Sequence, residues 1–263
     1  SSSTCETWRI IGVFDGKVKI MRGSQIGTYS WDNKNADTGA ETAYGKNDWT
    51  TARLMKLLNP NDYYTIDSND SGNGQSLYWN ASSGTCFSGK NNATTSCDFT
   101  SIGLKNDTTR NLIAETTYTI KGHDNNQVYV DVMYDKERVS GTVYTGRPTS
   151  WTGKIAVAYP SDYGYAADLS LCQKTLFDYD NGTCTANNWM KNIVTNNGAN
   201  IGWLLTPSSG YAYFAWYVHS VGNVNNYLNA YTALGVAPVL SLNSELDVGA
   251  GTGTSSSPYQ LSV

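Results

Sequence analysis

Cysteine is the residue type with the clearest chemical signal in this chain of 263 residues. Cys86 and Cys97 enclose the polar loop "CFSGKNNATTSC", and Cys172 and Cys184 enclose "CQKTLFDYDNGTC". Two short-range pairs in polar loops predict two disulfides, which indicate an extracellular location and stabilise the fold by about 3 kcal/mol each in the chain-entropy model. Zinc is the alternative, but neither pair has the close spacing of zinc ligands. Cys5 has no predicted partner.

Other side chains suited to catalysis or metal binding are few and scattered. His123 and His219 are the only histidines, and we expect His219 to contact a ligand rather than a metal. The stretch "DSNDSGNG", from Asp67 to Gly74, begins like a calcium-binding loop, but Tyr78 stands where the bidentate Glu belongs. A solvated turn is the simpler interpretation, as it is for "FDYDNGTC". Calcium therefore stays open and unassigned as a cofactor.

The sequence carries no enzyme motif. It has no "GxSxG" elbow, no "HExxH", no phosphate loop and no Cys/His dyad, although carboxylates paired through space cannot be seen in a sequence. We predict that the protein is not an enzyme. Only 15% of residues are charged and the net charge is -4, which disfavours a nucleic-acid partner. No apolar run is long enough to span a membrane.

A ring-rich segment between Gly210 and Val239 carries the strongest functional signal. In "GYAYFAWYVHSVGNVNNYLNAYTALGVAPV", Tyr, Phe, Trp and His alternate with Asn, Gly and Ala, and no side chain is charged. Rings on a rigid scaffold bury large areas with few torsions to freeze, and neighbouring Asn and Ser add adaptable hydrogen bonds. The segment predicts a binding surface. The alternative is a strand whose rings belong to the core.

The alternation in "AYFAWYVHSV" predicts a strand with two different faces. We expect Trp216, Val218 and Val221 to face the core. Tyr217 and His219 have the opposite parity, so we expect them to face outward and contact a ligand.

The elements that must position this segment include a hairpin and two helices. "TWRIIGVFDGKVKIMRGSQIG" predicts the hairpin, because Asp15-Gly16 separates two partly alternating apolar runs. "NDWTTARLMKLLN" predicts an amphipathic helix that is capped by Asn47 or Asp48 and followed by Pro60. "NDTTRNLIAETTYTI" predicts a second helix, which is capped by Asp107 and reaches Glu115.

The remaining segments indicate a β-rich domain. "QVYVDVMY" alternates and predicts a strand, and "WTGKIAVAYPSDYGYA" predicts a strand followed by an aromatic turn. "IGWLLTP", "AWYVHSVG" and "GVAPVLSL" are the last apolar runs, and the tail "GAGTGTSSSPYQLSV" predicts a final edge strand. Residues 61–107 form a long polar stretch that the first cysteine pair staples. No repeat or linker divides the chain, so we predict a single α+β domain over residues 1–263.

Motifs spread over most of the chain give a family resemblance. They are "WRIIGVFDGKVKIMR", "NDW..A.LMKLLN", "SLYWN.SSGTC", "NNATTSCDFT", "YPSDYGYA", "WLLTP.S", "GVAPVLSLNSEL" and "GTGTSSSPYQL". On these residues the chain resembles bacterial surface proteins whose ectodomains are similar to the C-type lectin fold, in the branch shared with formylglycine-generating enzymes. Some members carry an N-terminal pilin-like helix, which is absent here, and some are variable proteins of diversity-generating retroelements. Ala237 replaces the Arg that usually precedes Pro-Val in the last strand.

The resemblance implies a C-type lectin-like ectodomain, with a small antiparallel sheet, two flanking helices and long disulfide-stapled loops. It also implies that a retroelement randomises adenines, mostly in AAC codons, which never yields Lys, Glu, Gln, Met or Trp. None of the first four types occurs between residues 210 and 237, and Trp216 would be a fixed position. We therefore predict a variable binding segment at about 210–237. Its predicted contact residues are Tyr211, Tyr213, Phe214, Tyr217, His219, Tyr227, Leu228, Ala230, Tyr231 and Ala233.

These features together predict an extracellular, adhesin-like binding protein displayed on a bacterial cell surface or pilus. Its partner would be a protein or glycan on another cell or surface. One alternative is a structural subunit of a pilus or surface layer, in which the rings pack against neighbouring copies. A formylglycine-generating type of enzyme is a third hypothesis, but those enzymes rely on cysteines near the C-terminus and none follows Cys184 here.

Overall fold

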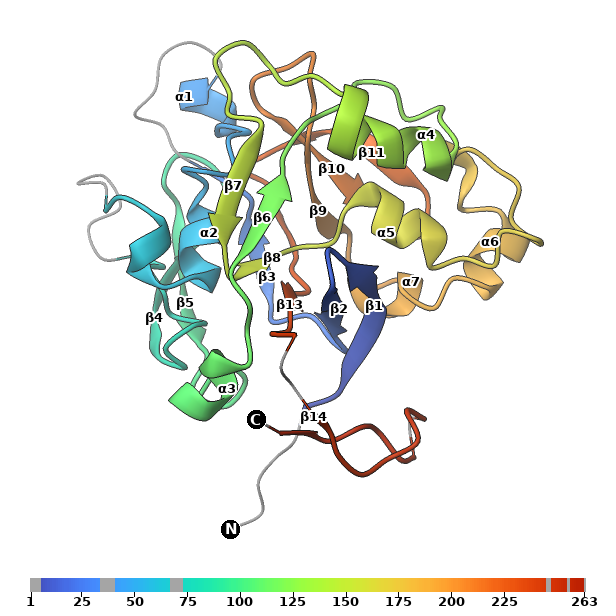
Figure 1. The fold of residues 1–263 in the computed structure, drawn as a ribbon. Helices are drawn as coiled ribbons and strands as arrows, with labels where there is room; N and C mark the ends of the chain where they lie inside the picture. The colour runs from blue at the N-terminus through green and yellow to red at the C-terminus, as the bar shows by residue number, and fades with distance from the viewer. Residues whose placement is uncertain (1–5, 34–40, 67–72, 245–246, 255, 263) are drawn as a thin grey trace.

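The computed structural model describes residues 6–33, 41–66, 73–244, 247–254 and 256–262 as a mixed α/β structure (Figure 1). Cys5 and the start of the calcium-like stretch lie outside these ranges. The strands are β1 (Trp8–Phe14), β2 (Lys17–Arg22), β3 (Thr28–Ser30), β4 (Ser83–Phe87), β5 (Thr94–Asp98), β6 (Thr116–Thr119), β7 (Ser150–Gly153), β8 (Ile155–Ala156), β9 (Gly202–Pro207), β10 (Phe214–Val218), β11 (Val224–Asn229), β12 (Ala233–Gly235), β13 (Val239–Ser241), β14 (Asp247–Val248) and β15 (Leu261–Ser262).

Short helices lie between these strands. They are α1 (Glu41–Tyr44), α2 (Arg53–Leu58), α3 (Asp107–Asn111), α4 (Val130–Asp135), α5 (Pro160–Tyr165), α6 (Gly182–Ala186) and α7 (Lys191–Val194), together with the single turns η1 (Asn61–Tyr63), η2 (Lys136–Ser140) and η3 (Leu176–Asp178). The predicted α+β class is therefore confirmed at the level of mixed helices and small sheets.

The first main sheet has the order β1-β2-β13-β8. The predicted N-terminal hairpin forms its edge, and Asp15 (φ 50°) and Gly16 (φ 75°) make the tight turn between β1 and β2. Both residue types tolerate positive φ, which is why Asp-Gly favours this turn. Since β13 pairs with β2, residues from the two ends of the chain share one sheet.

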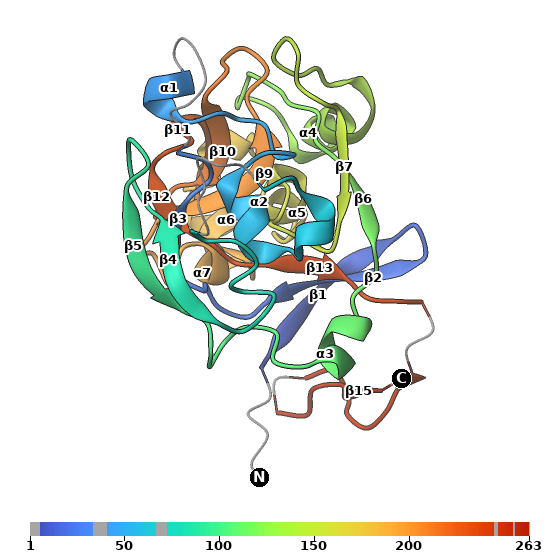
Figure 2. The same cartoon turned by 90° about the vertical axis from the view of Figure 1, so that its left-hand side faces the viewer.

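The second main sheet has the order β11-β10-β9-β12-β3 and carries the ring-rich segment. Strands β10 and β11 form a hairpin, while β12 returns between β9 and β3. Helices α4, α5, α6 and α7 lie on one side of this sheet, and α2 with the β4–β5 hairpin lies on the other (Figures 1 and 2). Both faces of β10 are consequently covered by other parts of the chain.

Both predicted helices exist, but each starts differently from the prediction. Helix α2 begins at Arg53, and Asp48 instead closes the preceding turn by accepting a hydrogen bond from the Thr50 N–H at 3.1 Å. Helix α3 is capped by Asn106, not Asp107, because the Asn106 Oδ1 accepts from the Thr109 N–H at 2.8 Å. Helix α3 also ends well before Glu115, because the chain next joins β6.

The prediction of a strand in "QVYVDVMY" is wrong. Val130 to Asp135 form helix α4, in which Val130 and Met133 are buried and Val132 is exposed. Val128 is also buried, but it precedes the helix. The apparent strand-like alternation of buried residues therefore combines Val128, which lies before the helix, with the buried face of the helix itself. A run this short cannot separate period 2 from period 3.6.

The predicted aromatic turn after the strand is helix α5. Pro160 occupies its first turn, where a missing N–H costs nothing, and the Asp162 carboxylate accepts from the Tyr159 N–H at 2.9 Å. At the C-terminus, β15 pairs only with β14, as a two-stranded ribbon below the main sheets in Figure 1. The predicted final strand therefore exists as β15, but it belongs to a separate two-stranded sheet and not to the edge of a main sheet.

Candidate functional site

A continuous row of rings lies at one end of the β10–β11 hairpin. Ring centroids are 6.1 Å apart for Tyr227–Phe214, 4.9 Å for Phe214–Tyr211, 4.6 Å for Phe214–Tyr213, 4.9 Å for Tyr213–Tyr44 and 6.3 Å for Tyr44–Tyr231. We call these residues the aromatic strip. All its members except Tyr44 come from the segment predicted to bind.

The aromatic strip is partly open to solvent. Tyr211 and Tyr227 are 42% and 50% exposed, and the other members are half-buried. At the Tyr231 end lies the exposed Lys90, whose Nζ is 5.7 Å from the ring centroid of Tyr44 and 5.9 Å from that of Tyr231. These distances are within range of cation–π attraction. The strip is thus an uncharged surface with a cation at one end.

Buried Asn47 anchors the loop that presents Tyr211 and Phe214. Its side-chain amide donates to the carbonyls of Ser208 at 3.0 Å, Tyr211 at 2.7 Å and Phe214 at 2.9 Å. Its backbone N–H donates to the carbonyl of Ala212 at 2.9 Å. Asn47 was one of two predicted helix caps, with Asp48 as the other; in the structure its side chain holds the ring-bearing loop instead.

Two further side chains support the same loop from distant parts of the chain. Half-buried Arg147 donates to the Ala212 carbonyl at 3.1 Å and to the Asn47 Oδ1 at 3.3 Å. The Asp124 carboxylate accepts a hydrogen bond from the Ser208 hydroxyl at 2.5 Å. The loop before β10 is therefore held by hydrogen bonds at its base, while its Tyr211 ring is exposed and its Tyr213 ring is half-buried.

The position of Tyr44 depends on a tight turn after α1. Gly45 has φ +81°, and a Cβ there would lie 2.0 Å from the Asp32 carbonyl oxygen, so only glycine fits. The Tyr44 carbonyl accepts from the Tyr231 N–H at 3.1 Å. This backbone bond fixes the two rings beside each other.

The first disulfide supports the Lys90 end of the strip. Cys86 and Cys97 are joined as predicted, with an S–S distance of 2.04 Å, and tie β4 to β5. In the loop between these strands, the Gly89 N–H donates to the Ser30 hydroxyl at 2.8 Å, and the Asn33 amide donates to the Gly89 carbonyl at 2.8 Å. Lys90 therefore extends from a loop that is anchored to the main sheet.

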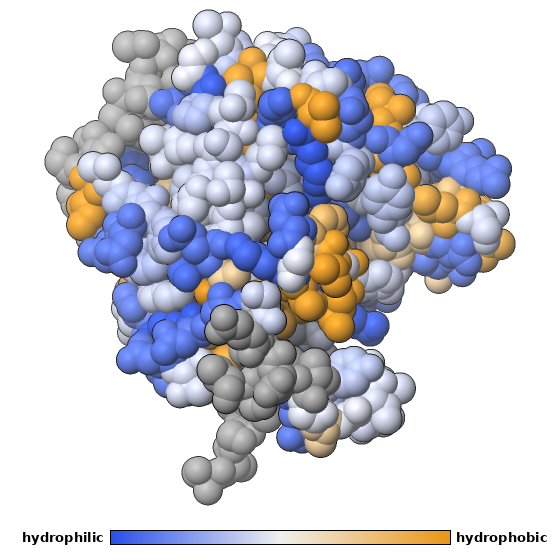
Figure 3. All heavy atoms as spheres, viewed as in Figure 1, coloured by the Kyte–Doolittle hydropathy of each residue, from blue (hydrophilic) through white to orange (hydrophobic). Residues whose placement is uncertain are grey.

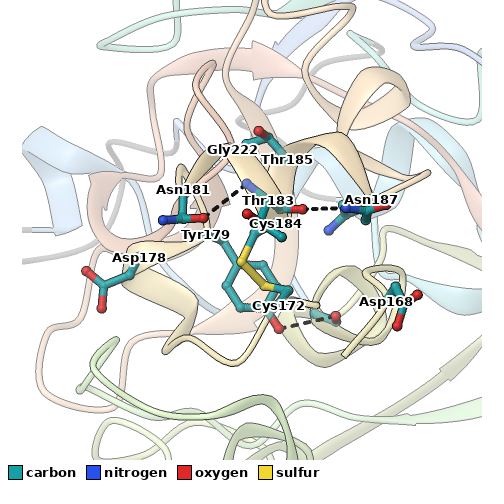
Figure 4. Close-up of a disulfide and its surroundings, with 12 residues drawn as sticks. Asp168, Cys172, Asp178, Tyr179, Asn181, Thr183, Cys184, Thr185, Asn187 and Gly222 are labelled. Atoms are coloured by element: carbon teal, nitrogen blue, oxygen red, sulfur yellow. Dashed lines mark hydrogen bonds between the residues drawn. A yellow bond between two sulfur atoms is a disulfide. The ribbon is translucent and has the colours of Figure 1, made fainter. Parts of the chain in front are cut away.

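The second predicted disulfide, Cys172–Cys184, is also confirmed and lies against Tyr179 (Figure 4). The neighbouring Tyr163 donates from its hydroxyl to the Gly222 carbonyl at 2.8 Å. Gly222 belongs to the turn between β10 and β11, so this disulfide region supports the end of the hairpin opposite the aromatic strip.

The predicted contact residues fall into distinct groups. Tyr211, Tyr213, Phe214, Tyr227 and Tyr231 form the strip, and His219 lies at the opposite end of β10, in the β10–β11 turn. Leu228 and Ala233 are half-buried, and Leu228 packs against the core.

Three predictions of side-chain orientation are wrong. Tyr217 is 9% exposed and packs in the core on the α2 side, because both faces of β10 are covered. Ala230 is fully buried. Val221, which was expected in the core, is 51% exposed because it lies in the turn. Trp216 and Val218 are fully buried, as predicted.

Sequence reasoning did not predict Tyr44 and Lys90 as part of the site. Neither stands in a motif, and each reaches the strip only through the packing of α1 and of the β4–β5 hairpin. The only local feature that could have pointed to Lys90 was its place in the loop between Cys86 and Cys97. Its pairing with rings far along the chain is a property of the tertiary fold.

A buried ion cluster joins β2, η2 and α5. Lys19 pairs with Asp162, and Arg138 lies 2.8 Å from Glu137 and 3.7 Å from Asp162. Burial lowers the pKa of Lys19 and raises that of Glu137 to about 7. Lys19, Glu137 and Asp162 are at most 4% exposed, so no ligand reaches them. We assign the cluster a structural role.

A shallow hollow of about 400 Å³ lies elsewhere, beside the start of β1. It is lined by Glu6, Thr7, Arg9, Arg22, Gly23, Ser24 and Ile193. Glu6 pairs with Arg22 at 2.8 Å, and the lining contains no second carboxylate, histidine or cysteine for acid–base chemistry. Within the described ranges, no group of three His, Cys, Asp or Glu side chains is placed to hold a metal ion, and no helix is long and apolar enough to cross a membrane.

Comparisons of this chain with protein-family models, curated proteins and solved structures found no match. The geometry of the aromatic strip is therefore the main basis for assigning a function.

Proposed function

We propose that the protein is an extracellular, adhesin-like binding domain whose aromatic strip contacts a macromolecular partner. The observation that carries this proposal is the unbroken ring contact from Tyr227 to Tyr231, partly open to solvent, on a loop held by Asn47. Two disulfides are compatible with an extracellular setting. A C-type lectin-like fold and display on a bacterial surface or pilus belong to the same proposal.

The physical case is one of preorganised contact area. Tyrosine and phenylalanine rings have few torsions to freeze, and tyrosine adds a hydroxyl for hydrogen bonds. The hydrogen bonds of Asn47 and Arg147 to the loop carbonyls fix the backbone before a partner arrives. Binding to such a surface avoids most of the entropy loss of ordering a loop.

Diversification by a retroelement is part of the proposal. The rings of Tyr211 and Tyr227 are exposed, so their substitution leaves the core unchanged, while Trp216 is a fully buried core residue. That arrangement suits a fixed framework with exchangeable contacts. The burial of Tyr217 and Ala230 makes these positions unsuitable for contact. A near-copy of the DNA for residues 210–237, differing only at adenines, beside a reverse transcriptase gene would support this mechanism.

A ring-removal experiment tests the binding function. A phage-displayed library of random peptides and a glycan array are screened with the wild type, with a Tyr211→Ala/Tyr227→Ala variant and with a Tyr129→Ala control. Tyr129 is 55% exposed and lies outside the strip. We expect ligands selected by the wild type to be lost by the double variant and kept by the control. Equal binding by all three proteins would show that the aromatic strip does not contact the ligand.

A structural subunit is a second candidate, and the edge strand β1 favours it. Ile10 and Val13 of β1 are 55% and 66% exposed. Figure 3 shows an apolar patch in the region of the β1–β2 hairpin. Exposed apolar edge strands tend to pair with other chains. Two copies of β1, antiparallel and centred on Ile11, would set Arg9 opposite Val13, so no like charges would meet across the pair.

Solution size tests this second candidate. Sedimentation at rising protein concentration is compared for the wild type, Val13→Lys and Val139→Lys, since Val139 is an equally exposed control at 65%. We expect the wild type and Val139→Lys to assemble as the protein concentration rises, and Val13→Lys to remain monomeric. A wild type that stays monomeric at all concentrations would rule out pairing through β1.

A further inference from the structure

We propose that the partner of the aromatic strip is a protein segment that carries a carboxylate, and that Lys90 binds this carboxylate. The inference rests on the proposed binding function and adds the chemical class of the partner. It joins two observations that are independent in sequence: the ring row of residues 211–231, and a cation supplied by the first disulfide loop.

Lys90 is the exposed cation whose ammonium lies over rings of the strip. The segment from Tyr211 to Tyr231 contains no charged residue. Lys90 is exposed, and its ammonium makes ring contacts with Tyr44 and Tyr231 but no ion pair among the described residues. A partner that covers the strip also covers this ammonium. The cost of desolvating it is offset when the partner supplies a negative charge.

The position of Lys90 is restrained before binding. Its loop is closed by the Cys86–Cys97 bond and tied to the sheet through Ser30 and Asn33. The backbone that carries Lys90 is therefore fixed before binding, and its ammonium already lies within cation–π range of the Tyr44 and Tyr231 rings. A free surface lysine would lack this preorganisation.

The ring geometry favours a protein partner over a glycan. Away from the Lys90 end, neighbouring rings in the strip meet at interplanar angles of 39° (Tyr44–Tyr213), 72° (Tyr213–Phe214) and 89° (Phe214–Tyr227), whereas Tyr44 and Tyr231 beside Lys90 are nearly parallel at 23°. A sugar ring stacks best on an open flat face, whereas tilted rings leave notches between them. Branched and aromatic side chains of a protein can fill such notches with close packing.

A matched pair of lysines makes the test specific. Lys90 lies inside the first disulfide loop. Lys174, which lies inside the second disulfide loop and is also exposed, is its matched control. A phage library of random 12-residue peptides is selected separately on the wild type, Lys90→Glu and Lys174→Glu proteins. Peptides from the wild type are then synthesised and titrated against all three, and against Lys90→Met, at low and high NaCl.

We expect the wild type and Lys174→Glu to select peptides enriched in Asp and Glu together with apolar residues. Lys90→Glu should lose this enrichment. Lys90→Met should weaken a selected peptide by roughly 3- to 10-fold and remove most of its salt dependence, the range expected for one partly desolvated charge pair.

The outcomes separate this inference from the function on which it rests. Peptides that depend on Tyr211 and Tyr227 but show no acidic enrichment would overturn the role of Lys90 and keep the binding surface. Failure to find any ring-dependent peptide or glycan would overturn both. Binding of acidic oligosaccharides that is lost in Lys90→Met would assign the cation to a glycan and refute the protein partner.

Discussion

Glu137 gives this fold a pH-dependent stability that can be measured directly. Its carboxyl group is fully buried, and the Ser161 N–H donates to its Oε1 at 3.0 Å. Burial raises the pKa from an ordinary value of 4.5 to about 7, outweighing the Arg138 guanidinium that lies 2.8 Å away. In the unfolded chain the group is solvated and its pKa returns to the ordinary value.

The sign of the effect follows from which state holds the proton more tightly. Below about pH 4.5 both the folded and the unfolded chain carry the protonated group. As the pH rises from 4.5 to 7, the unfolded chain loses its proton first, so the free energy of unfolding falls. At about 1.4 kcal/mol per pH unit, the gap between the two pKa values corresponds to a loss of about 3 kcal/mol.

The assay compares the wild type with Glu137→Gln, which keeps the shape of the side chain and cannot titrate. Urea unfolding is followed by tryptophan fluorescence at several pH values between 4.5 and 7.5. Carboxylates outside the cluster of Lys19, Glu137, Arg138 and Asp162 act equally on both proteins, so the difference in stability reports on Glu137 and its partners in that cluster. We expect the variant to gain about 3 kcal/mol relative to the wild type across this range.

A difference that stays constant with pH, or a variant that becomes relatively less stable at pH 7.5, would contradict this argument. Either result would mean that Glu137 is ionised in the folded protein and that Arg138 outweighs the desolvation of the carboxylate.

Three further predictions concern the framework of the site. Asn47→Ala should lower the free energy of unfolding by about 3 kcal/mol, at about 1 kcal/mol for each of three lost hydrogen bonds, and should expose the loop before β10 to limited proteolysis. Replacing Cys172 and Cys184 by Ser should cost about 3 kcal/mol in denaturant unfolding, and an equal midpoint with and without the bond would contradict its structural role. Tyr217→Ala should cost about 3–5 kcal/mol because the ring is buried, whereas Tyr227→Ala should change thermal stability by less than about 1 kcal/mol; similar losses would mean that both rings belong to the core.

Local chemistry was enough to predict several features of this protein. Asp15-Gly16 has the backbone freedom that a tight hairpin turn needs, and each pair of cysteines lies close enough along the chain to close its loop. Uncharged rings concentrated near the C-terminus marked the segment that forms most of the aromatic strip. These signals depend on residues that are neighbours in the chain.

Features that depend on distant neighbours could not be predicted in this way. Parity along β10 predicted an outward Tyr217, but the packing of α2 covers that face of the sheet and buries the ring. In "QVYVDVMY", a run of eight residues fits either a strand or a helix, and packing against α5 selects the helix.

The sequence by itself determined the staples, the first turn and the ring-rich composition, because each is set by covalent geometry or by residue type within a few positions. Only the tertiary structure decided which rings are exposed. It also placed Tyr44 and Lys90 beside residues more than a hundred positions later in the chain. Burial is a property of what packs over a residue, and a single sequence does not state which distant segment will do so.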